Sequence, residues 1–154
     1  DVIGAEIVGK NLFEDVITIK IKKAEAEVGD SVITSGKVLV GRIIEVGAEI
    51  ARVQLISHTQ SSFDAKIETK DIIGVLKGEG NGTLFFDLVA QDKELREGDV
   101  VTTSKLGGIF PANLLIGEVA TVEQVDVETF QKATVSPFFE LSSAKLLFVI
   151  TSDI

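Results

Sequence analysis

Short runs in which apolar and polar residues alternate recur along the whole chain. In the clearest run, Ile17, Ile19 and Ile21 are separated by single polar residues. This period of two is typical of a half-buried β-strand, and no long window keeps the period of a helix. Runs of this kind, together with a β-branched run at 100–103 and a run at 145–151 that is apolar on both faces, predict strands over residues 1–9, 13–22, 31–35, 38–46, 51–56, 63–67, 72–76, 83–89, 100–103, 117–127, 129–135 and 145–151. About a dozen short strands, with turns every eight or so residues, indicate an all-β barrel or sandwich.

The chain contains one β unit twice. Val28–Ser35 reads VGDSVITS, and Glu97–Ser104 reads EGDVVTTS at an offset of 69 residues. Gly41–Val46 and Gly117–Val122 also correspond, at an offset of 76 residues. The second copy therefore carries seven additional residues, and they fall in the loop that contains Gly107, Gly108 and Pro111.

Two copies of one unit, each supplying about six strands, predict two small β-barrels in tandem. We expect residues 1–68 to form the first barrel and residues 69–154 the second, with a soft boundary that individual strands can cross. Closed barrels suit this chain because closure leaves no strand edge exposed.

The loop in the second copy is rich in both glycine and apolar residues. Two glycines loosen it, and Pro111 disfavours the α region for the residue before it. Apolar side chains in such a loop either plug the end of a barrel or face a partner. Since the chain has no Trp or Tyr, phenylalanine must supply any aromatic anchor for a partner. The candidate partner-binding residues are Leu106, Ile109, Phe110, Phe63, Phe138 and Phe139.

The run GDVVTTSKLGGIFPANLLIGEV resembles the signature of the MreC family, the bacterial rod-shape-determining proteins. The first copy also fits, because Lys37–Ile43 stands where the family has Gly-Leu-Val-Gly-Arg-Val. The similarity extends from about Val2 to about Ile150. It departs from the family at Lys105 and Asn113, where a glycine is usual. Asn tolerates a positive φ, so the second departure is mild.

This resemblance implies two small β-barrels packed together on the extracytoplasmic side of a single-pass membrane protein. It further implies a preceding transmembrane helix and coiled coil, and a role in organising lateral cell-wall synthesis. The implied partners are MreD, the elongation penicillin-binding protein, the RodA glycosyltransferase and further MreC copies in dimers or filaments. No cofactor is implied.

Composition narrows the function classes. The net charge is −9, and no basic face is apparent, which argues against binding to nucleic acid or to anionic lipid. The absence of cysteine excludes disulfides, thiolate catalysis and cysteine-ligated zinc. No apolar run approaches the roughly 20 residues that span a bilayer. The chain has no methionine, even at position 1, so we expect a processed protein or a fragment.

An enzymatic alternative depends on His58, the single histidine. Ser57, Ser61, Ser62 and Asp64 stand near it, and β-barrel hydrolases use a Ser-His-Asp triad. However, Gly29-Asp30-Ser31 has as its counterpart Gly98-Asp99-Val100, which lacks the hydroxyl. We therefore expect a polar loop histidine and no enzyme. A trypsin-like β-barrel hydrolase and a glycan-binding β-module remain the alternatives to a scaffold.

Two further motifs have structural interpretations. Gly78–Gly82 resembles a phosphate-binding loop, but a strand and no helix is predicted after it, so a hairpin with an Asn-Gly core is expected. Glu25, Glu27 and Asp30 are a weak candidate for a calcium site. The position of Asp30 after a glycine is explained by hydrogen bonding to the backbone of a turn. No metal site is predicted.

Overall fold

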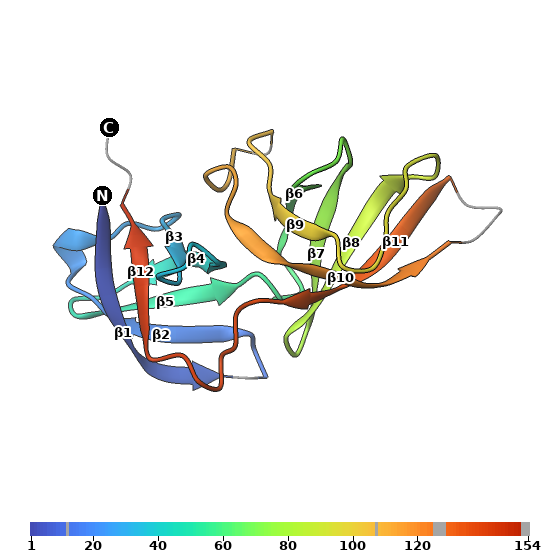
Figure 1. The fold of residues 1–154 in the computed structure, drawn as a ribbon. Coiled ribbons are helices and arrows are strands. Elements are labelled where there is room, and N and C mark those ends of the chain that lie inside the picture. Colours follow the sequence, from blue (N-terminus) through green and yellow to red (C-terminus); the bar gives the residue numbers. More distant parts are fainter. Residues whose placement is uncertain (12, 107, 125–128, 152–154) are drawn as a thin grey trace.

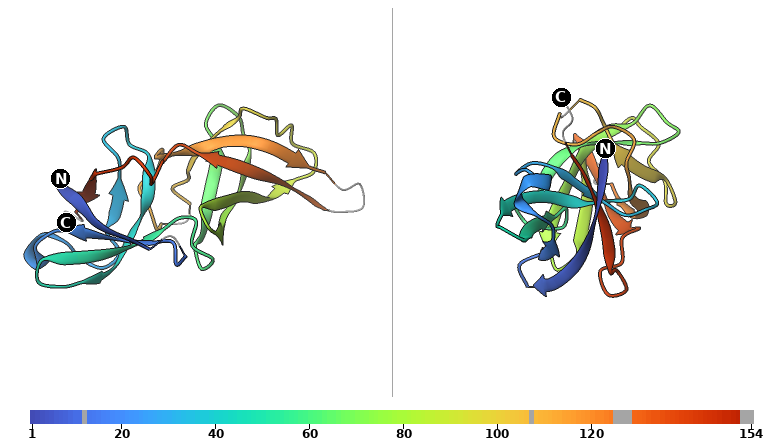
Figure 2. Two further views of the ribbon diagram at one scale, coloured as in Figure 1. Left: turned by 90° about the horizontal axis from the view of Figure 1, so that it is seen from below. Right: turned by 90° about the vertical axis from the view of Figure 1, so that its left-hand side faces the viewer.

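A computed structural model describes residues 1–11, 13–106, 108–124 and 129–151. These residues form twelve β-strands, arranged as two closed six-stranded barrels, and one short 3₁₀ helix at Lys23–Glu25 (Figure 1). The predicted all-β class with two small barrels is therefore confirmed. The barrels lie one beyond the other along the long axis of the molecule, and the first barrel carries both ends of the chain (Figure 2). Within the described ranges, no helix is long and apolar enough to cross a membrane.

The first barrel is built from both ends of the chain. Its strands, in spatial order, are β1 (Val2–Asn11), β12 (Leu146–Ile150), β3 (Ser31–Ile33), β4 (Leu39–Val46), β5 (Ile50–Leu55) and β2 (Val16–Lys20). All neighbouring strands are antiparallel. Phe148 of β12 lies opposite Gly4 on one side and Ile33 on the other, so β12 closes the barrel between β1 and β3.

The second barrel consists of a continuous internal segment. Its strands, in spatial order, are β10 (Leu115–Glu123), β11 (Phe130–Pro137), β8 (Thr83–Ala90), β7 (Ile73–Gly80), β6 (Ser62–Ile67) and β9 (Val100–Thr103). Here too, all neighbours are antiparallel. Part of the predicted strand 117–127, residues 125–127, lies outside the described residues.

The observed division differs from the expected boundary between residues 68 and 69. Strand β6 belongs to the second barrel because Phe63, Ala65 and Ile67 are buried in its core. Strand β12 belongs to the first barrel because Leu147 and Val149 are buried in that core. The chain therefore crosses between the barrels twice, over residues 56–61 and over residues 138–145, so strands do cross the expected boundary.

The two copies of the sequence repeat fold into the same local structure. Gly29 and Gly98 both adopt a positive φ, near +100° and +90°. Their N–H groups donate at 2.8 Å to the carbonyls of Ile43 and Val119, which are also equivalent positions of the repeat. In each turn the aspartate after the glycine accepts a backbone N–H at 2.9 Å. The repeated sequence motif thus forms a Gly-Asp turn that is hydrogen-bonded to the strand after the loop.

A second glycine of the repeat is required by close backbone packing. A Cβ atom at Gly41 would overlap the carbonyl oxygen of Gln54, and one at Gly117 would overlap that of Ser136. Both glycines lie in the strand that follows the loop. Each lies opposite the last residue of an antiparallel neighbouring strand, and Gly117 is also next to a register shift. The glycines at these equivalent positions allow each barrel to close tightly.

Candidate interaction site at the junction of the barrels

The two barrels contact each other through both backbone and apolar side chains. The N–H of Leu115 in β10 donates to the carbonyl of Lys37 at 3.0 Å, and Val38 forms a parallel bridge with Leu115. Ile33, Leu39 and Ile56 lie in the same buried cluster as the core of the second barrel. The junction is therefore a packed interface.

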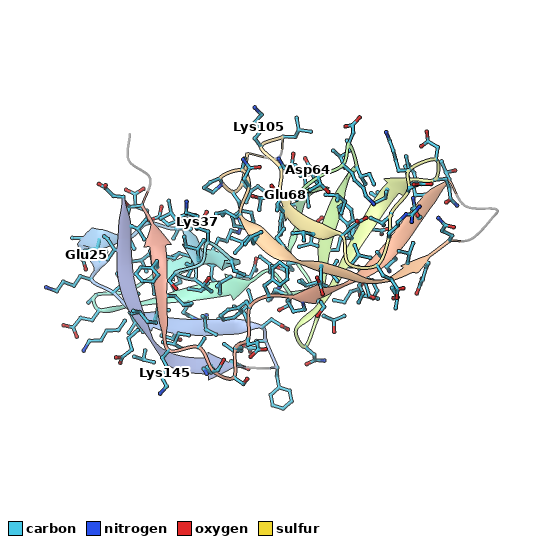
Figure 3. All side chains as sticks on the ribbon, in the orientation of Figure 1. Glu25, Lys37, Asp64, Glu68, Lys105 and Lys145 are labelled. Carbon is cyan, nitrogen blue, oxygen red and sulfur yellow. The ribbon has the colours of Figure 1, made fainter. Side chains whose placement is uncertain are left out.

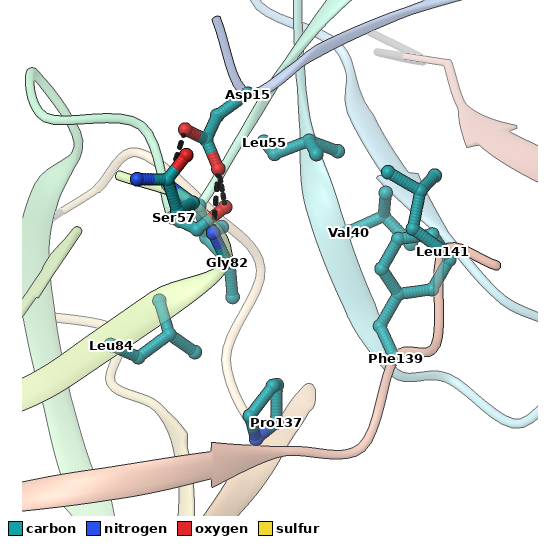
Figure 4. A pocket seen from close by; sticks show the side chains of 11 residues that line it. Asp15, Val40, Leu55, Ser57, Gly82, Leu84, Pro137, Phe139 and Leu141 are labelled. Carbon is teal, nitrogen blue, oxygen red and sulfur yellow. Dashed lines mark hydrogen bonds between the residues drawn. The ribbon is translucent and has the colours of Figure 1, made fainter. Parts of the chain in front are cut away.

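Asp15 is the polar centre of this junction. It lies in the turn between β1 and β2 and is only 4% exposed. Its Oδ1 accepts hydrogen bonds from Ser57 Oγ at 2.6 Å and from the Gly82 N–H at 2.9 Å (Figure 4). Its Oδ2 accepts a third bond, from the Asn81 N–H at 2.9 Å. These three donors compensate the burial of the carboxylate.

The β7–β8 hairpin presents its two N–H groups to Asp15 because of its turn type. Asn81 and Gly82 form the two-residue connection, and both have a positive φ, of 53° and 74°. This is the type I′ geometry that Asn-Gly favours. The hairpin interpretation of Gly78–Gly82 is therefore confirmed, with Thr83 starting a strand. What the sequence did not reveal is that this hairpin binds a buried carboxylate from the other barrel.

An apolar cavity of about 310 Å³ lies beside Asp15, and we call it the inter-barrel pocket. Strands of both barrels and the second crossing segment form its walls (Figure 4). Phe139 and Leu141 of that segment line it and pack against the core of the first barrel, which includes Val40 and Leu55 (Figure 4). The lining residues are Asp15, Val40, Leu55, Ile56, Ser57, Asn81, Gly82, Leu84, Pro137, Phe139 and Leu141.

A wider depression adjoins the pocket, and Asp15 and Asn81 line both. We call it the acidic groove. It has a volume of about 560 Å³ and takes its residues from the β1–β2 turn, from strands of the first barrel, from the first crossing segment and from the β7–β8 hairpin. Its charged residues are Glu14, Asp15 and Glu79 against the one cation Arg52, and its lining also includes His58 and Phe13. Phe13 is 94% exposed.

The predicted partner-binding residues separate into two groups. Phe63 and Phe110 are buried and meet edge to face, with ring centroids 4.8 Å apart, as a plug at the end of a barrel would; their contact with a partner stays a prediction. Leu106 and Ile109 are exposed in the loop, as is Phe138 in the second crossing segment, and Phe139 lines the inter-barrel pocket. For these four residues, contact with a partner remains a prediction.

The glycine loop is anchored at its base. Thr103 Oγ1 donates to the carbonyl of Pro111 at 2.6 Å and accepts the Leu114 N–H at 2.9 Å. Lys105 projects away from the barrel at the start of the loop (Figure 3). Gly107 lies outside the described residues. The loop thus presents Leu106 and Ile109 to solvent from a fixed base.

The residues of the enzymatic alternative do not form a triad. The Ser57 hydroxyl donates to Asp15, and His58 Nδ1 accepts the Gln60 N–H at 3.0 Å. Both groups therefore have partners outside a Ser-His-Asp relay. Asp30, the calcium option, accepts the Glu27 N–H through its carboxylate, as a turn residue does. In the part of the chain that the structure describes, no group of three His, Asp or Glu residues is arranged to hold a metal ion.

Comparison with known proteins gives one consistent result. The sequence model of a family described as "Rod shape-determining protein MreC, barrel core" matches residues 8–151. The cell shape-determining protein MreC of Listeria monocytogenes is 28% identical over 144 residues, which cover 89% of this chain and 49% of that protein. The chain thus spans about half the length of this relative.

Solved structures share the fold. The crystal structure of MreC from Pseudomonas aeruginosa has a TM-score of 0.91 at 25% identity and covers 97% of this chain and 99% of that one. The major periplasmic domain of the cell shape-determining filament MreC has a TM-score of 0.79 at 20% identity, with coverages of 97% and 94%. A complex between penicillin-binding protein PBP2 and MreC from Helicobacter pylori gives 0.69 at 17% identity, with coverages of 99% and 100%.

Proposed function

The chain belongs to the MreC family of rod shape-determining proteins, and we propose that it is a non-enzymatic scaffold of the machinery that elongates the cell wall. In this role it binds cell-wall synthases and associates with further copies of itself, and so maintains cell shape. The observation that carries the proposal is the family match over residues 8–151, which includes both barrels and the junction between them.

The elongation penicillin-binding protein is the first expected partner. The Helicobacter pylori complex pairs a protein of this fold with PBP2, which supports this choice. MreD and the RodA glycosyltransferase complete the proposed partner set, as the family resemblance implies. The chain acts on the extracytoplasmic side of a single-pass membrane protein, in agreement with the periplasmic domain described for a relative of the same fold.

The features of the described surface suit a scaffold better than an enzyme. Leu106 is 71% exposed and Ile109 is 42% exposed on an anchored loop, and the inter-barrel pocket offers an apolar cavity. Enzyme sites instead place a nucleophile, a base and an orienting group in hydrogen-bond contact with one another. Here, the clustered Ser57, His58 and Asp15 are occupied by hydrogen bonds that fix turns and the barrel junction.

The proposal is tested by direct binding. The ectodomain of the elongation penicillin-binding protein from the same organism is immobilised and titrated with the purified chain, and a division-specific penicillin-binding protein serves as the control. We expect about micromolar affinity for the first and at least tenfold weaker binding to the second. No binding to the elongation enzyme at about 100 μM would overturn the proposal.

Self-association is tested separately by sedimentation. The chain, and a longer form that includes the preceding segment, are compared over a range of concentrations. A dimer or larger species in at least one of them is expected. Monomers in both at high concentration would remove self-association from the proposed role.

A further inference from the structure

The inter-barrel pocket and the acidic groove are adjacent halves of one surface and differ in chemistry. Asp15 and Asn81 line both of them, so a ligand that fills the pocket extends directly into the groove. The pocket needs both barrels, because Leu55 comes from the first and Leu84 from the second. Binding sites commonly form at such domain junctions.

The pocket selects an apolar group. Its walls are mostly aliphatic and aromatic, and its volume of about 310 Å³ is more than enough for one large side chain. The buried polar groups beside it, the Asp15 carboxylate and the Ser57 hydroxyl, are already engaged, since both Asp15 oxygens accept hydrogen bonds and the Ser57 hydroxyl donates to one of them. A sugar hydroxyl that enters the apolar part of the pocket would lose its hydrogen bonds to water, whereas an apolar side chain has none to lose.

The charge of the acidic groove favours a positively charged group. Glu14, Asp15 and Glu79 against Arg52 leave an excess of two negative charges among the groove residues. The carboxylates of Glu14 and Glu79 are exposed, and each forms one solvent-exposed ion pair, with Arg52 at 3.7 Å and with Lys132 at 3.9 Å, which an incoming cation can join or replace. The whole chain carries a charge of −9, so the field around the groove is also negative.

We propose that the inter-barrel pocket and the acidic groove together bind an extended segment of a partner protein in which a large apolar residue lies next to a lysine or arginine. The apolar side chain fills the pocket and the basic side chain pairs with Glu14 or Glu79. The inference rests on the proposed function in one respect, that the segment belongs to the elongation penicillin-binding protein. Asp15 maintains the site because it holds the β1–β2 turn against the β7–β8 hairpin.

The first test uses peptides and is independent of the synthase. The ¹⁵N-labelled chain is titrated with acetyl-Gly-Lys-Phe-Lys-Gly-amide, and matched peptides replace Phe by Ser or both Lys by Glu. We expect the first peptide to shift the amide signals of Ser57, Asn81 and Gly82, with weaker effects at high salt. The two control peptides should shift them several-fold less. Equal shifts by all three peptides, or shifts confined to other regions, would overturn the proposal.

The second test uses the synthase ectodomain and matched variants. Leu141→Glu places a charge on the pocket wall, and Leu146→Glu makes the same change at a leucine that is 56% exposed and does not line the pocket. We expect Leu141→Glu to weaken binding at least tenfold and Leu146→Glu to leave it unchanged. The double variant Glu14→Gln/Glu79→Gln should weaken binding several-fold and reduce its dependence on salt.

Thermal unfolding establishes that each variant is folded. If Leu141→Glu does not fold, Pro137→Trp replaces it, because Pro137 is an exposed wall residue and tryptophan would fill the pocket. Wild-type binding that survives both pocket changes would overturn the docking site and leave the proposed function intact. If the wild-type chain does not bind the synthase, the proposed function fails, and the peptide titration alone decides whether the site exists.

Discussion

The carboxylate of Asp15 joins the two barrels by accepting a hydrogen bond from the backbone N–H of Gly82, which stands 67 positions further along the chain. A second bond, from Asn81, reaches the same carboxylate from the same hairpin. The relative placement of the barrels therefore depends on one buried side chain in addition to the apolar contacts of Ile33, Leu39 and Ile56.

We expect Asp15→Asn to destabilise the protein by about 2–3 kcal/mol, because an amide NH₂ would face the donors of Ser57 or Asn81 inside the junction. Asn tolerates the positive φ of 51° at this position, so the change isolates the hydrogen bonds from backbone strain. Urea denaturation followed by circular dichroism measures the loss. Asp71→Asn, at a fully exposed side chain, is the control and should change stability by less than about 0.5 kcal/mol. Equal effects of the two changes would contradict the role of Asp15.

Gly41→Ala and Gly117→Ala should each destabilise the fold by about 3 kcal/mol or more, because the new Cβ overlaps a backbone carbonyl that cannot rotate away. Gly36→Ala provides the comparison, since its Cβ would meet only the Thr34 hydroxyl at 3.8 Å. That change should be near neutral. Thermal melting of the three variants checks the ranking, and a stable Gly117→Ala protein would refute the close-packing explanation of the repeated glycine.

Phe110→Ala should cost about 3–5 kcal/mol in stability, because it leaves a cavity where the ring meets Phe63. Leu106→Ala should change stability by less than about 0.5 kcal/mol, because that side chain is 71% exposed. A double-mutant cycle with Phe63→Leu and Phe110→Leu should show a coupling of about 0.5–1.5 kcal/mol. No coupling would mean that the two rings plug the barrel independently.

His58→Ala should leave the chain without hydrolytic activity on a general peptide library, as in the wild type. We expect a small loss of stability, about 0.5–1.5 kcal/mol, from the missing bond between the Gln60 N–H and the imidazole. A hydrolytic activity present in the wild type and lost in the variant would revive the enzymatic alternative. Ser57→Ala separates the two effects, since it removes the bond to Asp15 and leaves His58 in place.

The repeat was predictable from the sequence because its chemistry is local. A glycine with positive φ followed by an aspartate that accepts a nearby N–H requires only a few adjacent residues, and Gly29-Asp30 and Gly98-Asp99 form the same turn. The Asn-Gly hairpin is local in the same sense. The strand pattern followed from the alternation of apolar residues, which the burial of Ala51, Val53 and Leu55 illustrates.

The barrel boundary and the role of Asp15 were not predictable because they depend on distant partners. The short apolar run of β12 predicts a strand but not that its neighbours are β1 and β3. Asp15 occupies a polar position at the start of a predicted strand, and nothing near it in the sequence identifies Ser57 or Gly82 as its donors. For the same reason, the contact between the rings of Phe110 and Phe63 was not predictable from the sequence.

The position of β12 sets the order in which the two barrels are completed. The second barrel contains all its strands once residue 137 has left the ribosome, whereas the first barrel remains open until residue 150 follows. The second barrel can therefore close before the first barrel does. Until then, β1 and β3 carry unpaired edges, so a chain that ends before β12 keeps one finished barrel and one that is prone to aggregate.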